Sequence, residues 1–224
     1  MAQFVQEYAV LRWMMLAAFV IAAGIVLSRV AAAAASSTGS VAQTQPPSDA
    51  SAGHSESDAA HLVMCLVMLG MLAFPSGASP HAVRGVLTAM AVVFAGLLTI
   101  RAVEYATQGR PLPIDRLVPL GYHIVAAAAM LYAMSGHTGS GHVGGPSTGP
   151  ALVLAVLFLL DALLVTFTAC TGRTRAHVPG PLGLLVRSGG CVAALTGPAK
   201  PWAAVPHVVM DAGTAYMLAA VIIR

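Results

Sequence analysis

Charged residues are scarce in this sequence: they make up 8% of its 224 residues, whereas 58% are hydrophobic. A soluble domain carries about 25% charged residues, so this chain cannot cover a surface that faces water. The mean hydropathy of +0.81 also excludes a water-soluble protein. The composition therefore predicts an integral membrane protein whose main partner is the lipid bilayer.

Several chemical signatures are also missing. Three cysteines are too few and too scattered to form a disulfide framework. No run of Lys and Arg interleaved with aromatic residues is present, so a nucleic-acid-binding surface is not expected. The chain has no G-x-S-x-G, H-E-x-x-H, P-loop or dinucleotide-binding motif, and we therefore do not expect an enzyme.

Long apolar runs predict an all-α fold, a bundle of about six transmembrane helices. A helix needs about 20 mainly apolar residues to cross the bilayer core. We expect a single membrane domain over residues 1–224, with spans at about 8–28, 58–74, 82–101, 117–135, 151–171 and 202–223. The second span is the shortest, and Ser57 or Asp58 is expected to cap its N-terminus. Residues 36–57 are rich in Ser, Ala, Thr, Gly and Pro, which predicts a disordered linker.

The first apolar run has a second interpretation. It ends in Arg29 and AAAAAS, so a cleaved signal peptide is an alternative to a membrane helix. Its apolar part is long for a signal peptide, and Arg29 fits poorly just before a cleavage site. These two features favour the membrane helix.

Three of the predicted spans carry a histidine that is followed by methionines at helical spacing. The residues are His61 with Met64 and Met68, His123 with Met130 and Met134, and His207 with Met210 and Met217. Alternate spans run in the same direction, so the three histidines should lie at similar depth near one face of the membrane. A shared site then requires that the three helices are neighbours.

Imidazole and thioether groups together are typical ligands of a soft metal ion. Imidazole suits copper and sulfur ligands favour Cu(I), while methionine lines an apolar path without burying a charge. The M-x-x-x-M pairs resemble those in a pore helix of eukaryotic copper transporters. Our leading hypothesis is Cu(I) binding or movement by these nine residues. Haem is an alternative, although one pair of axial ligands would leave most of the methionines without a role. Methionine also fills gaps between helices, so an accessory subunit with no metal site stays open.

Two carboxylates occur near the middle of predicted spans. Asp161 is centred in the fifth span and Asp211 lies about halfway along the sixth, one helical turn after His207. An ionisable residue at this depth is costly and is a functional candidate by default. The two carboxylates and His207 are candidates for a proton relay, and the second hypothesis is therefore a proton- or ion-coupled transporter of small solutes. For Asp161 the alternative is a neutral acid that is hydrogen-bonded to a neighbouring helix.

The segments LRWMMLAAF, HLVMCLVMLGMLAFPSG and YHIVAAAAMLYAM resemble an actinobacterial family of multi-span membrane proteins catalogued as a domain of unknown function. The shared features are L-R-W at residues 11–13, H-x-x-M-x-x-x-M from His61, and Tyr122-His123 before a Met-bearing run. The AAAA stretch at 126–129 makes the fourth span poorer in methionine than the family pattern. The resemblance implies a bacterial cytoplasmic membrane and supplies no activity.

Overall fold

The computed structural model describes residues 9–38, 49–74, 79–109, 114–135, 147–171 and 201–223. Within these ranges the chain forms six α-helices and one 3₁₀-helix, and no strand. They are α2 (Ala9–Thr38), α3 (Asp49–Ala73), α4 (Pro80–Thr107), α5 (Ile114–Met134), α6 (Thr148–Thr171), η3 (Pro201–Ala204) and α9 (Val205–Ile222). The predicted all-α fold is confirmed.

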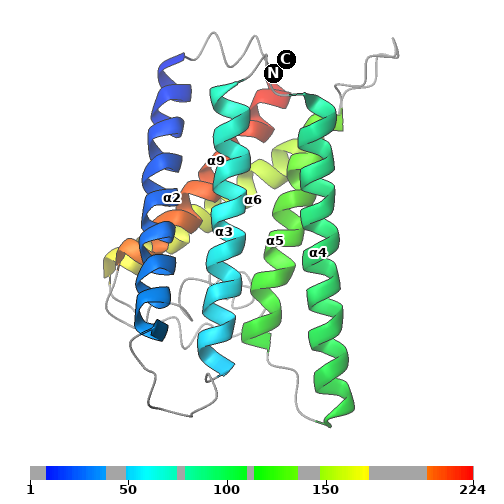
Figure 1. The fold of residues 1–224 in the computed structure, drawn as a ribbon. Coiled ribbons are helices and arrows are strands. Elements are labelled where there is room, and N and C mark those ends of the chain that lie inside the picture. The colour runs from blue at the N-terminus through cyan, green and yellow to red at the C-terminus, as the bar shows by residue number, and fades with distance from the viewer. Residues whose placement is uncertain are drawn as a thin grey trace.

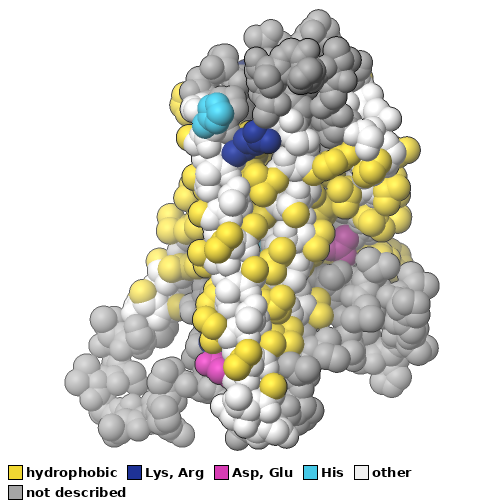
Figure 2. Space-filling view, turned by 90° about the vertical axis from the view of Figure 1, so that its right-hand side faces the viewer, with side chains coloured by type: hydrophobic (Ala, Val, Ile, Leu, Met, Phe, Trp, Pro, Cys, Tyr) yellow, Lys and Arg dark blue, Asp and Glu magenta, His cyan; other side chains and the backbone are white. Residues whose placement is uncertain are grey.

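Five of these helices are long and apolar enough to cross a membrane. The candidate spans are Ala9–Ala35, His81–Thr107, Leu117–Met134, Thr148–Phe167 and Val205–Ile222, whereas the apolar part of α3, Asp58–Ala73, is shorter. Hydrophobic side chains cover the helices on the face drawn in Figure 2, and few charged ones interrupt them. An exposed apolar surface of this extent suits a lipid environment. The chain is accordingly described as a multi-pass membrane protein.

The predicted linker differs from the structure at both of its ends. Helix α2 continues to Thr38, and α3 already begins at Asp49. The expected cap at Ser57 or Asp58 is therefore wrong, because both residues lie inside α3. Residues 39–48 fall outside the described part of the chain. The predicted linker was too long because its Ser- and Ala-rich composition was taken as a sign of disorder. Alanine favours helix even where its neighbours are polar, so both helices extend into this stretch.

Helix α9 is the central element of the bundle. It contacts α2, α3, α5 and α6, while α2 also packs on α3 and α4 packs on α5. Figure 1 shows α3, α5 and α9 running in the same general direction, with α6 and α9 crossing the other four helices obliquely. The predicted alternation of direction therefore holds, and the three histidine-bearing helices are neighbours.

A close approach at Gly213 brings three helices together in the core. A Cβ atom at Gly213 in α9 would collide with the ring of Phe19 from α2, and would lie only 2.9 Å from Cε of Met68 in α3. Phe19 and Met68 are both fully buried. The missing side chain at Gly213 thus allows α9 to pass close to α2 and α3.

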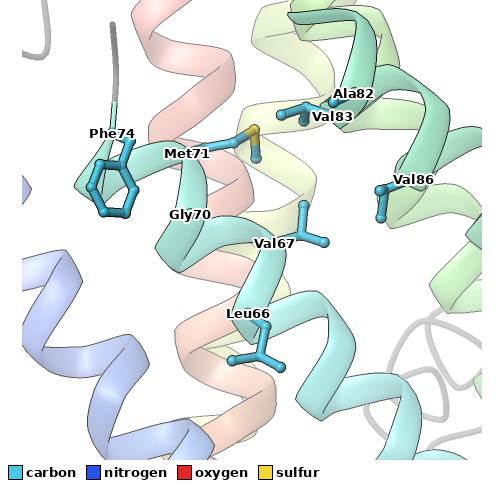
Figure 3. A pocket seen from close by; sticks show the side chains of 8 residues that line it. All are labelled: Leu66, Val67, Gly70, Met71, Phe74, Ala82, Val83 and Val86. Atoms are coloured by element: carbon cyan, nitrogen blue, oxygen red, sulfur yellow. The ribbon is translucent and has the colours of Figure 1, made fainter. Parts of the chain in front are cut away.

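An apolar groove lies between α3 and α4 (Figure 3). Its walls include Leu66, Met71 and Val86, and none of the residues that line it is ionisable. On α3 these residues lie mainly opposite the face that carries His61 and Met64. The groove therefore offers an apolar surface without an ionisable side chain, and the ionisable residues of the core lie elsewhere.

Candidate functional site

The first turns of α9 place His207 and Asp211 on one face of the helix. Helix α9 begins at Val205 with a proline in its first turn, where the missing N–H of proline costs nothing. His207 and Asp211 are four residues apart, so their side chains lie one above the other. Both are completely buried. The local sequence of α9 thus places two polar side chains next to each other inside an apolar bundle.

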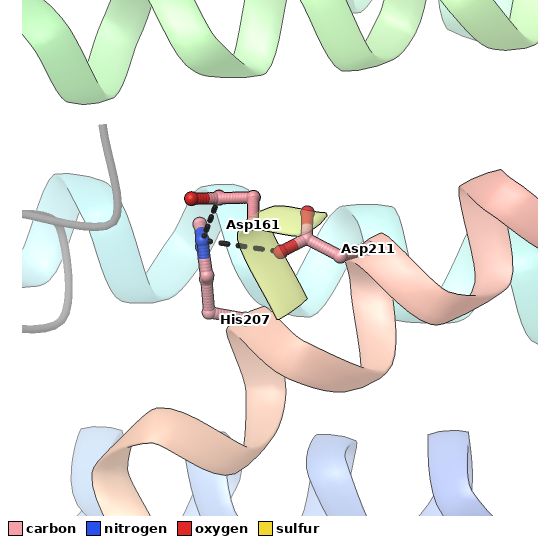
Figure 4. Close-up of side chains that lie close together, drawn as sticks. All are labelled: Asp161, His207 and Asp211. Carbon is pink, nitrogen blue, oxygen red and sulfur yellow. Dashed lines mark hydrogen bonds and ion pairs between the residues drawn. The ribbon is translucent and has the colours of Figure 1, made fainter. Parts of the chain in front are cut away.

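Helix α6 supplies the second carboxylate. Atom Nε2 of His207 lies 2.9 Å from Oδ2 of Asp161 and 3.3 Å from Oδ2 of Asp211 (Figure 4). One candidate ligand atom from each of the three residues lies within 4.8 Å of the others, and all three residues are buried. The side chains of two helices therefore converge on a single imidazole nitrogen.

This arrangement has a shortage of positive charge. Nε2 carries at most one hydrogen and can donate it to only one carboxylate, and the shorter contact is to Asp161. Neither oxygen of Asp211 has a hydrogen-bond partner in the described part of the chain. Two ionised carboxylates beside one imidazole would leave net negative charge in an apolar interior, which is expensive. A proton or a metal cation would remove that cost.

The three histidines singled out by the sequence lie together in the bundle. The ring centroid of His61 is 4.8 Å from that of His123 and 6.1 Å from that of His207. All three side chains are buried, with exposed fractions of 3%, 1% and 0% in the order His61, His123, His207. The sequence predicted their similar depth, and the packing of α3, α5 and α9 makes them neighbours. Metal binding by them stays a prediction.

Aromatic side chains surround the imidazole cluster. The ring of Phe94 from α4 stacks on His123 at a centroid distance of 5.2 Å. The ring of Tyr122 lies 4.8 Å from His207 and 5.8 Å from His123, and its buried hydroxyl has no hydrogen-bond partner among the described residues. Sequence reasoning did not place Tyr122 or Phe94 in the site. The signals for Tyr122 were its position beside His123 and the Tyr-His pair in the family pattern.

The six predicted methionine ligands are all in the core. Met64, Met68, Met130, Met134, Met210 and Met217 are at most 8% exposed and belong to one hydrophobic cluster. Met71, at the edge of the same stripe, is only half-buried and lines the groove instead. Burial in one cluster is required both of packing residues and of methionines that line a path for a soft metal ion.

An ion pair joins α2 to α3 one turn before His61. Atom Nη2 of Arg29 lies 3.1 Å from Oδ1 of Asp58, and the two side chains are 26% and 10% exposed. Sequence reasoning had considered Arg29 only as a flank of the first span and Asp58 only as a cap.

The comparisons with known proteins place the chain in a family without assigning an activity. No curated protein and no solved structure matches it. One family model matches residues 53–221, a range that contains all three histidines and both carboxylates of the site. Since that match covers most of the chain, the protein belongs to the family described as a domain of unknown function (DUF5134).

Proposed function

We propose that this protein binds a transition-metal cation inside the membrane, at a centre formed by Asp161, His207 and Asp211. The observation that carries the proposal is the convergence of these three buried donors from two helices, within 4.8 Å of one another. Carboxylate and imidazole donors hold zinc at about 2.0–2.2 Å, so ligand atoms that share one metal lie about 3 to 3.5 Å apart. The separations of 2.9 and 3.3 Å at Nε2 of His207 are close to that spacing.

Charge balance favours a divalent ion at this centre. The two negative charges of the carboxylates offset the charge of Zn(II), Mn(II) or Fe(II) when the imidazole is neutral, whereas Cu(I) would leave one negative charge uncompensated. Carboxylate ligands also suit the harder divalent ions better than they suit Cu(I). The proposal places the protein in the bacterial cytoplasmic membrane, which rests on the family resemblance.

The soft-metal form of the proposal concerns the histidines and methionines. Cu(I) binding or movement through His61, His123 and the buried methionines is supported by their shared core and by ligand chemistry. Cu(I) bound in this way would compete with the divalent ion for His207. A titration with each kind of ion shows which of them the protein binds.

The test is a metal titration of protein purified in detergent, with Zn(II), Co(II), Mn(II) and Cu(I) each competed against a chelator. Wild type should bind one divalent ion, and Asp161→Asn or Asp211→Asn should weaken that binding by more than about 100-fold, because loss of a direct ligand exceeds the effect of losing an outer partner. Glu104→Gln is the matched control, because this carboxylate forms an exposed ion pair with Arg101 on α4. Binding that survives both Asp substitutions would overturn the proposal.

A proton relay is the second candidate, because one imidazole nitrogen contacts both carboxylates. With Nδ1 of His207 protonated, Nε2 can accept a proton from the carboxylic acid of Asp161 and then donate it to the carboxylate of Asp211, or the reverse. In vesicles that contain a pH-sensitive dye, a relay would give proton flux that Asp161→Asn abolishes. Flux in a protein that binds no metal would favour the relay over the metal centre.

A further inference from the structure

The orientation of the His207 ring decides whether the proposed metal centre can form. Its Nε2 atom must stay between the two carboxylates, and it lies 2.9 Å from Oδ2 of Asp161 and 3.3 Å from Oδ2 of Asp211 (Figure 4). An imidazole ring can rotate about its bond to Cβ, because torsions of this kind have broad energy minima. A contact that limits this rotation would therefore hold Nε2 in place for a metal ion.

The usual constraint on a metal-binding histidine is a hydrogen bond at the nitrogen that does not bind the metal. That bond fixes the tautomer and the orientation of the ring, and its loss typically lowers metal affinity about 10- to 100-fold. In His207 this second nitrogen is Nδ1, which is buried and has no hydrogen-bond partner within the described ranges. Among the described residues, packing is therefore what holds the ring.

The ring of Tyr122, from α5, supplies such packing. Its centroid lies 4.8 Å from that of the His207 ring, and the two planes are tilted by 40°. The ring of His61 is farther from His207, with a centroid distance of 6.1 Å. Tyr122 is buried, and a tyrosine ring is a large and rigid contact surface. A buried ring at this distance restricts the rotation of the imidazole.

A second contact anchors Tyr122 to the helix that carries Asp161. Its ring meets that of Phe158 on α6 edge-on, with a centroid distance of 6.1 Å and an interplanar angle of 74°. This separation and angle are typical of aromatic pairs in proteins. Phe158 is buried and precedes Asp161 by three residues, so the two side chains lie on the same side of α6. Tyr122 thus contacts His207 on α9 and also contacts α6 about one turn from Asp161.

We propose that Tyr122 is the positioning residue of the metal centre, whose ring holds Nε2 of His207 between the two carboxylates. The inference rests on the proposed function, because it explains how that centre is kept ready for the ion. The ring carries this role rather than the hydroxyl, since the ring contacts both helices while the buried hydroxyl has no hydrogen-bond partner among the described residues. Such preorganisation reduces the cost of ordering the ligand when the ion binds.

The experiment measures the Co(II) affinity of the full-length protein in detergent by competition with a chelator. It also records the visible spectrum of the bound ion, which reports the geometry of its ligands. Tyr122→Leu should weaken binding about 10- to 100-fold and change the Co(II) spectrum at saturation, because the imidazole no longer meets the ion in its original orientation. Tyr122→Phe restores the ring without the hydroxyl, so affinity should recover to within about 3-fold of wild type, with the wild-type spectrum.

Tyr132→Leu is the matched control. Tyr132 is a half-buried residue of the same helix, about 15 Å farther along it, and its hydroxyl donates a hydrogen bond to the backbone oxygen of Ser147. Loss of an aromatic side chain there should change neither the Co(II) affinity nor the spectrum. Tyr122→Met is a second non-aromatic variant, and methionine adapts to irregular gaps, so the test stays decisive if Tyr122→Leu fails to fold.

The outcomes separate the two proposals. Wild-type affinity and an unchanged spectrum in Tyr122→Leu or Tyr122→Met would overturn the positioning role and leave the metal centre standing. Equal losses of affinity in Tyr122→Phe and Tyr122→Leu would also overturn it, because the hydroxyl and not the ring would then be needed. Failure of wild type to bind Co(II) or any other divalent ion would overturn the proposed function, and the positioning role with it.

Discussion

Nε2 of His207 lies 2.9 Å from Oδ2 of Asp161, and this contact joins α9 to α6 inside the bundle. The residues are 46 positions apart in the chain. Both partners are buried, so the pair cannot exchange its contacts for water when one partner is removed.

Asp161→Ala should lower the free energy of unfolding by about 3 kcal/mol, because it leaves a buried imidazole without its closest partner. Asp161→Asn should cost less, since the amide oxygen still accepts a hydrogen bond from His207. Denaturation by SDS in mixed micelles, followed by circular dichroism, measures both variants without added metal. Equal stability of Asp161→Ala and wild type would show that Asp211 alone is a sufficient partner for His207.

Gly213→Ala should destabilise the protein by about 1–3 kcal/mol, the usual cost of overpacking a core. The added Cβ collides with the ring of Phe19, which is fully buried and has little room to move. Phe19→Leu should recover part of the loss in the double variant. The same denaturation assay measures all three variants.

Gly96→Ala in α4 is the control for this packing argument. Nothing lies within 4 Å of a Cβ atom built at Gly96, and alanine is the better helix former. We expect Gly96→Ala to be neutral or slightly stabilising. If Gly213→Ala behaves in the same way, then α2 and α9 do not pack as closely as described.

The ion pair of Arg29 and Asp58 should couple α2 to α3 more strongly than an exposed pair would. Because both side chains are mostly buried, a double-mutant cycle with Arg29→Gln and Asp58→Asn should give a coupling energy of about 1–3 kcal/mol. The matched comparison is Arg101 with Glu104, whose side chains are 40% and 48% exposed. There we expect about 0.5 kcal/mol or less. If the coupling energy of Arg29 and Asp58 is also about 0.5 kcal/mol or less, the result would contradict the close packing of α2 on α3.

Met64→Leu and Met210→Leu distinguish a thioether ligand from a packing residue. Each methionine lies one turn after a histidine of the cluster and is fully buried. Leucine conserves the volume, so stability should change by less than about 1.5 kcal/mol per site. If the sulfur atoms bind Cu(I), affinity for Cu(I) should fall while stability is retained.

Met90→Leu provides the control for the methionine variants, because Met90 is buried in α4 outside the three stripes. It should change neither Cu(I) affinity nor stability to a large extent. Cu(I) affinity that is unchanged in all three variants would assign the methionines to packing and confine any copper to the imidazoles.

The sequence by itself determined the class of protein and the identity of most residues in the cluster. Apolar runs and scarce charge are local properties, so they predicted the helices and the membrane environment without knowledge of the packing. The spacing of His207 and Asp211 likewise placed both on one helix face, because helical periodicity is the same in any tertiary context. The beginning of α3 at Asp49 was missed, since a polar, alanine-containing stretch is compatible with both helix and linker.

Only the tertiary structure decided which helix faces meet. Asp161 is one of many positions around an apolar helix, and nothing in its neighbours shows that it faces His207 on α9. The same holds for Phe94 over His123 and for Arg29 beside Asp58. Periodicity gives the direction of a side chain relative to its own helix axis, whereas the rotation, tilt and choice of neighbours depend on how all the side chains of the bundle fit together. That fit brings two carboxylates and three imidazoles to one place.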